Sequence, residues 1–162
     1  QYKKFSVKTV AMLMDQMIER IRWIHSQHYL LLNARADSFY VGHQNDKNRL
    51  YVQDFDLVRR FEDNNGVHDK YSEGNKFNGV LRYASVNSHL GVRSSRRDDL
   101  ESLGYIAAYF LTGTLPWQVA KPVTELKYDK AWQKKMMTPL TELFKDQPEE
   151  FVEYMKIVKY WK

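Results

Sequence analysis

The segment from Asp98 to Thr112 constrains the fold more than any other part of the chain. Apolar side chains occupy almost every side of the helix that it would form, at Leu100, Leu103, Tyr105, Ile106, Ala107, Ala108, Phe110 and Leu111. A helix that is apolar all round has to be buried inside a larger domain. Gly113, with Pro116 after it, is a typical helix stop. The sequence therefore predicts a central helix that other elements must cover.

Three further helices are predicted. From Thr9 to Gln27, apolar residues recur three and four positions apart, which is typical of an amphipathic helix with one buried face. The other two helices are predicted at Val123 to Lys135 and at Pro148 to Tyr160. Pro148 and the two Glu residues after it suit a helix N-terminus. The apolar residues of the first helix are Val10, Leu13, Met14, Met17, Ile18, Ile21 and Ile24.

A small β-hairpin is predicted between these helices. Ser38 to Val41 and Leu50 to Val52 are rich in aromatic and β-branched residues, and a polar turn from Gly42 to Arg49 separates them. From Arg59 to Gly79 the chain has few apolar anchors, so we expect a long irregular segment, which in a compact domain is usually functional or mobile. The coarse fold class is one mainly α domain with a small β-hairpin.

Composition narrows the class of protein. The 162 residues are enough for one domain, and with 43% hydrophobic and 14% aromatic residues they can bury a sizeable core. The absence of cysteine excludes a disulfide scaffold and a thiolate zinc site. The net charge of +5 favours acidic partners such as phosphorylated proteins, nucleic acid or anionic lipid, although many ordinary domains are equally basic.

No targeting segment is evident. The apolar run from Tyr105 to Leu111 is far shorter than the ~20 residues that cross a bilayer, and the polar start at Gln1 to Lys4 lacks a signal-peptide core. We expect a soluble protein, cytoplasmic or cytoskeletal, with the nucleus as the alternative.

The stretch SSRRDDLESLGY at Ser94 to Tyr105, followed by LPWQ at Leu115 to Gln118, carries a family resemblance. These residues resemble the second half of protein kinases of the casein kinase 1 family, and the resemblance runs from Phe5 to Lys159. It includes Ser85 to Asn87, where most protein kinases have Ala-Pro-Glu and this family has a Ser-Ile-Asn-like triplet. The resemblance implies a protein-kinase C-terminal lobe with a small β-hairpin.

The resemblance also implies that residues 1–162 are a single C-lobe, truncated at both ends relative to the family. The N-terminal lobe, with its glycine-rich loop and ATP-contacting Lys, is absent, so the chain supplies one wall of a nucleotide site. We expect no cofactor; ATP and Mg²⁺ would require an N-terminal lobe outside this sequence. Protein partners, acidic or phosphorylated ones among them, should cover the face that the missing lobe leaves. We expect no membrane or nucleic-acid partner.

The catalytic positions implied by the resemblance are altered. Phosphoryl transfer uses a catalytic-loop Asp as proton acceptor, and an Asp and an Asn as magnesium ligands. Asn33 stands at the catalytic Asp position, and an amide is a far poorer proton acceptor. Arg35 replaces the phosphate-contacting Lys, and Ser38 replaces the metal-binding Asn. Asp54 keeps the main metal-binding carboxylate, but the Gly of the family's Asp-Phe-Gly reads Asp56.

Other residues of this region are predicted to be structural. Leu31 and Leu32 replace the family's His and Arg, so they should seal the loop onto the central helix by packing. Asp37 matches a structural position of the loop, which leaves rescue of catalysis by Asp37 or Asp56 as a minor alternative. The charges of Arg96, Arg97, Asp98 and Asp99 should tie down neighbouring backbone where the helix becomes buried.

Two candidate ligand sites remain. Arg82 and Lys127 match basic positions with which the family recognises an anion beside the activation segment, and an Arg fork with a Lys could hold a phosphate. Val119 replaces a family Gly nearby, so plain surface cations are the alternative. His25 and His28 are spaced like a metal pair but lack a third ligand nearby, so we interpret them as structural.

Three functions remain in competition. The first is a catalytically inactive, casein-kinase-1-like pseudokinase module that acts as a binding or structural component of a larger assembly. The second is the C-lobe portion of an active serine/threonine kinase that uses ATP and Mg²⁺. The third is a basic phosphopeptide-binding module. Asn33 favours the first.

Overall fold

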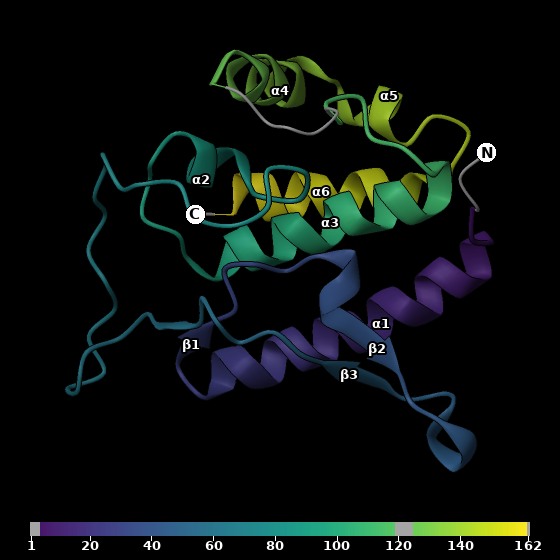
Figure 1. The fold of residues 1–162 in the computed structure, drawn as a ribbon, viewed down its shortest axis with the longest axis horizontal. Coiled ribbons are helices and arrows are strands. Elements are labelled where there is room, and N and C mark those ends of the chain that lie inside the picture. The colour runs from purple at the N-terminus through teal and green to yellow at the C-terminus, as the bar shows by residue number, and fades with distance from the viewer. Residues whose placement is uncertain (1–3, 119–124, 162) are drawn as a thin grey trace.

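The computed structural model describes residues 4–118 and 125–161, and its centre is helix α3, Arg96–Thr112. Helix α1 (Val7–Ser26) and helix α6 (Glu149–Tyr160) both pack against α3 (Figure 1). Gly113 ends α3 with a φ of 80°, a left-handed conformation that glycine adopts without strain. The prediction of a central buried helix with a glycine stop is confirmed. The fully buried apolar residues of α3 include Leu103, Tyr105, Ile106, Ala107 and Ala108.

Helix α1 buries the predicted face. Ser6 caps it by accepting a hydrogen bond from the Thr9 amide at 3.1 Å. Leu13 and Ile18 of the predicted stripe are only partly buried, at its edge. The residues that enter the core are Val10, Met14, Met17, Ile21 and Ile24.

The predicted hairpin is also confirmed. Strand β2 (Phe39–Val41) pairs antiparallel with strand β3 (Leu50–Val52), and the connection contains the short 3₁₀ helix η2 at Gln44–Asp46. Side chains of helix α1 hydrogen-bond to the backbone of the hairpin. Gln16 Oε1 accepts from the Leu50 amide at 2.8 Å, and Arg20 Nε donates to the Leu50 carbonyl at 2.9 Å.

Four short elements were not predicted. Strand β1 (Tyr29–Leu30) pairs antiparallel with strand β4 (Arg59–Arg60), and helices α2 (Val86–His89) and α5 (Leu140–Leu143) have four residues each. Elements of this length show no periodicity. The 3₁₀ helix η1 (Ala36–Ser38) leads into β2. After β4, the chain to Gly79 is irregular, as predicted, with one isolated bridge between Glu62 and His68.

Two predicted C-terminal helices are present. Helix α4 covers Glu125–Met137; the predicted start at Val123 lies outside the described residues. Pro148 precedes α6 as its N-cap, and Glu149 and Glu150 lie in the first turn. Val152, Met155 and Val158 of α6 are buried. Among the described residues, no helix has the length and apolar character needed to span a membrane.

Candidate functional site

The loop that leads from β1 to β2 carries most of the predicted catalytic positions, and Asp99 of α3 fixes its start. The Asp99 carboxylate accepts from the Leu31 amide at 2.9 Å and from the Leu32 amide at 2.8 Å. It also contacts His25 Nε2 of α1 at 2.9 Å. Leu31 is fully buried, and Leu32 has a φ of 62°, which is rare for a leucine. The loop is therefore anchored by one buried carboxylate, as predicted for Asp99.

Asn33, Arg35 and Asp54 come together beyond this anchor. Arg35 Nη2 lies 2.5 Å from Asp54 Oδ2, and both side chains are largely shielded from solvent. Asn33 Nδ2 lies 3.4 Å from the same carboxylate oxygen. The Asn33 Oδ1 atom is buried and has no hydrogen-bond partner among the described residues. The Asp54 carboxylate is therefore paired with a guanidinium.

Ser38 and Asp37 point to other partners. Ser38 is fully buried, and its hydroxyl lies 3.4 Å from the Asn33 carbonyl oxygen. The exposed Asp37 carboxylate lies 3.3 Å from Arg35 Nε. Arg35 thus bridges Asp37 and Asp54. A guanidinium between two carboxylates neutralises much of their negative charge.

Asp54 has an unusual backbone conformation, and the residue after it is exposed. Asp54 itself has a φ of 71°, in the left-handed region. Phe55, the next residue, is half exposed. The packing predicted for Leu31 is confirmed, because its side chain is fully buried in the core, whereas Leu32 is only partly buried.

The start of α3 organises a second polar cluster. Asp98 accepts from the Ser95 amide at 2.6 Å and from the Ser85 hydroxyl at 2.7 Å. Glu101, also buried, accepts from the Tyr105 hydroxyl at 2.5 Å and from the Val86 amide at 3.2 Å. These carboxylates hold α2 against α3. The structural role predicted for Asp98 is confirmed.

The predicted anion pair is described only in part. The Arg82 guanidinium lies over the rings of Tyr83 and Tyr109, at 5.7 and 5.3 Å from their centroids. The Trp117 indole donates to the Arg82 carbonyl at 2.8 Å. The Lys127 side chain and Val119 lie outside the described residues.

His25 and His28 have separate carboxylate partners. His25 contacts Asp99, and His28 Nδ1 lies 2.6 Å from Glu62 Oε2. These contacts agree with a structural role for His25, whose partner Asp99 is buried, while the His28 contact lies at the surface. Within the described ranges, no three His, Cys, Asp or Glu side chains form a group that could hold a metal ion.

The burial of Lys135 in α4 was not predicted from the sequence, and its side chain is fully buried. Its Nζ atom donates to the carbonyls of Leu81 and Ala84, at 2.9 and 2.6 Å, and lies 3.1 Å from His89 Nε2. Burial lowers the pKa of Lys135 to about 7. The only signal was its spacing of four residues from Ala131, which places both on the buried face of α4.

No model of a protein family matches the chain.

Proposed function

We propose that this chain is a catalytically inactive, casein-kinase-1-like pseudokinase module that acts through binding, as a component of a larger assembly. The observation that carries the proposal is the ion pair between Arg35 and Asp54. Asp54 stands at the position where the resemblance implies the main magnesium ligand. An arginine held 2.5 Å from that carboxylate competes directly with a metal ion.

The remaining positions support the same proposal. Asn33 offers an amide where a proton acceptor is needed, and a positioned general base contributes roughly 10²–10⁴ in rate. Ser38 directs its hydroxyl to the backbone of its own loop. With these residues the chain lacks the catalytic base and one of the two metal ligands, and the charge of the second ligand, Asp54, is neutralised by Arg35.

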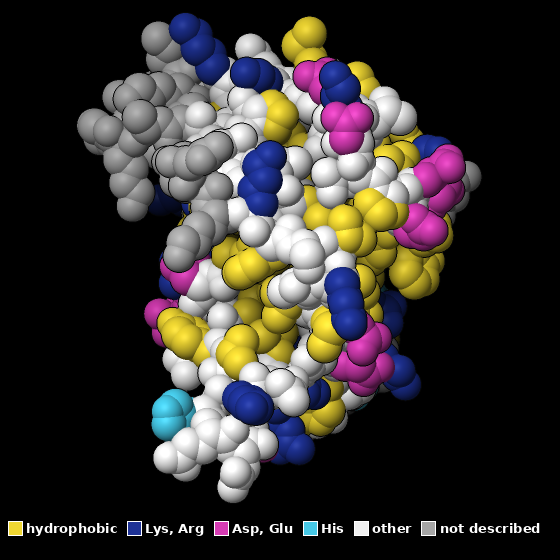
Figure 2. All heavy atoms as spheres, turned by 90° about the vertical axis from the view of Figure 1, so that its right-hand side faces the viewer, with side chains coloured by type: hydrophobic (Ala, Val, Ile, Leu, Met, Phe, Trp, Pro, Cys, Tyr) yellow, Lys and Arg dark blue, Asp and Glu magenta, His cyan; other side chains and the backbone are white. Residues whose placement is uncertain are grey.

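Exposed apolar side chains support a role in binding. Figure 2 shows hydrophobic side chains gathered across the middle of one face, with charged side chains between and around them. Large exposed apolar surfaces usually mark interaction sites. Apart from what that view shows, helix α1 and the hairpin carry exposed apolar side chains, each at least 39% exposed, at Val7, Met12, Trp23, Tyr40, Val41 and Tyr51.

The test compares three forms of the full-length protein: wild type, Asn33→Asp and Asp54→Ala. Binding of Mg-ATP is measured by calorimetry, and phosphate transfer is measured with an acidic peptide. We expect the wild type to show neither Mg-ATP binding nor transfer above the Asp54→Ala level. We expect Asn33→Asp alone to restore no transfer, because Arg35 still occupies Asp54. Wild-type transfer that falls at least 100-fold in Asp54→Ala would overturn the proposal in favour of an active kinase using ATP and Mg²⁺.

A further inference from the structure

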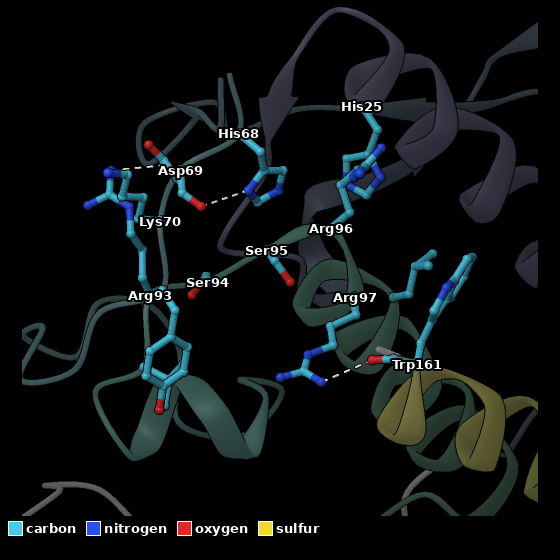
Figure 3. A pocket seen from close by; sticks show the side chains of 13 residues that line it. His25, His68, Asp69, Lys70, Arg93, Ser94, Ser95, Arg96, Arg97 and Trp161 are labelled. Carbon is cyan, nitrogen blue, oxygen red and sulfur yellow. Dashed lines mark hydrogen bonds and ion pairs between the residues drawn. The ribbon is translucent and has the colours of Figure 1, made fainter. Parts of the chain in front are cut away.

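A large pocket lies away from the Arg35–Asp54 pair, and neither residue lines it. It has a volume of about 530 Å³ and opens between the irregular segment at His68–Tyr71, the loop before α3 and the end of α6. Figure 3 shows Lys70 and Arg93 on one side of the view, and Arg96, Arg97 and Trp161 on the other. Four Lys or Arg residues line the pocket, but Asp69 is its single carboxylate.

The pocket has more positively than negatively charged side chains. Asp69 is shared between Arg93, at 2.9 Å, and Arg59, which contacts it more closely. Burial acts to raise the pKa of Asp69, but hydrogen bonds from Arg59 and Arg93 outweigh it and lower the pKa. One carboxylate therefore offsets two guanidinium groups, and the pocket keeps an excess of positive charge.

Two of the cations are available to a ligand. Lys70 and Arg96 are both exposed, and neither forms an ion pair with any other described residue. The Arg96 guanidinium rests over the Phe61 ring, 5.0 Å from its centroid, which holds the side chain at the pocket without using its donors. Arg97 is held by a hydrogen bond from Nη1 to the Trp161 carbonyl at 3.1 Å.

The pocket also has apolar walls. Leu100 and Val92 line it, together with the exposed rings of Tyr71 and Trp161. The N-terminus of α3 is not itself the proposed binding site for an anion, because the Asp98 carboxylate already lies there and accepts from the Ser95 amide. Clustered Lys and Arg donors suit a phosphate, and aromatic and aliphatic walls suit the side chains that flank it in a peptide.

We propose that this pocket binds the phosphoryl group of a phosphorylated protein segment. Lys70 and Arg96 supply free cations for the phosphate, and Arg93 joins them while it remains paired with Asp69. Nucleic acid is the poorer match, because its phosphates run along an extended strand, whereas these cations surround one pocket that contains a carboxylate. The site is separate from Arg82 and Lys127, and it does not depend on the proposed absence of phosphate transfer.

The test uses a fluorescein-labelled phosphoserine peptide and its unphosphorylated counterpart, with binding followed by fluorescence anisotropy on the full-length protein. We expect the phosphopeptide to bind at least about tenfold more tightly. The double variant Lys70→Gln/Arg96→Gln should lose at least about tenfold of that affinity. The matched control Lys47→Gln/Lys145→Gln removes two exposed cations elsewhere and should lose less than twofold. Circular dichroism verifies that both variants are folded.

Several results would overturn the proposal. Equal binding of the two peptides, or equal losses in the two double variants, would indicate a diffuse basic surface. A loss confined to Arg82→Gln would assign the phosphate to another place. Inorganic phosphate that binds as tightly as the phosphopeptide would make free phosphate the ligand, and tighter binding of a single-stranded oligonucleotide would make it nucleic acid. None of these outcomes bears on Mg-ATP binding or phosphate transfer, so the two proposals can fail separately.

Discussion

The Asp99 side chain makes three contacts that hold the candidate site together. Its carboxylate accepts from two consecutive loop amides and contacts His25, so it joins α3, α1 and the loop. We predict that Asp99→Asn lowers the free energy of unfolding by about 2 kcal/mol, because the amide group replaces an acceptor oxygen with a donor at a buried position. Urea unfolding measures the change, and hydrogen exchange at Leu31 and Leu32 should become faster.

A matched control is Asp46→Asn, which alters an exposed carboxylate 3.8 Å from Arg49. It should change the unfolding free energy by less than about 0.5 kcal/mol. If Asp99→Asn destabilised the protein no more than Asp46→Asn, the anchoring role of Asp99 would be wrong.

The roles of some single residues could be predicted from the sequence, and those of others could not. Asp98 and Asp99 were identified because charges at the start of an apolar helix need partners close by. The pairing of Arg35 with Asp54 was not predicted, because the two residues are 19 positions apart and meet only through the fold. Lys135 was missed because a lysine normally indicates exposed surface.

At the scale of elements, the packing of α3 on α6 depends on Gly104. A Cβ atom at this position would lie 2.0 Å from Met155 Sδ, and Met155 is fully buried. We predict that Gly104→Ala lowers the unfolding free energy by about 1–2 kcal/mol, since overpacking outweighs the better helix propensity of alanine. Thermal and urea unfolding measure this change.

The double variant Gly104→Ala/Met155→Ala separates overpacking from other effects. Met155→Ala alone should cost about 2–5 kcal/mol through the cavity that it leaves. In its presence Gly104→Ala should become neutral or stabilising, which gives a coupling energy of about 1–2 kcal/mol. Additive effects of the two substitutions would show that Gly104 is not a close-packing position.

Element length decided which secondary structure could be predicted. Helices α1, α3, α4 and α6 extend over several turns, so a helical period or a long apolar run marks them in the sequence. Helix α2 has four residues and is held by Ser85, whose hydroxyl caps it and bonds Asp98. Strands β1 and β4 have two residues each. Elements this short are defined by tertiary contacts, which a local pattern does not contain.

At the scale of the whole molecule, Lys135 joins parts of the chain that lie 46–54 residues apart in the sequence. From α4 it binds the carbonyls of Leu81 and Ala84, lies beside His89 of α2, and covers the Tyr105 ring of α3 at 4.9 Å. We predict that Lys135→Met costs about 2–4 kcal/mol of unfolding free energy at pH 7, because two carbonyls lose their donor. Lys134→Met, at an exposed neighbouring position of α4, should cost less than about 0.5 kcal/mol.

The pH dependence of the Lys135→Met effect tests how this amine is charged. Burial lowers the pKa of Lys135 to about 7, from the value of 10.5 that a lysine has in water. Between these two values the unfolded chain binds a proton that the folded chain does not, so rising pH stabilises the wild type. His89, whose pKa is lowered to about 3 by burial and by the Lys135 charge, is largely neutral from pH 7 upward, so the difference reports Lys135. From pH 7 to pH 9 the wild type should therefore gain about 2 kcal/mol over Lys135→Met in urea unfolding. A constant difference would mean that the three surrounding acceptors and aromatic rings hold Lys135 as an ammonium ion throughout.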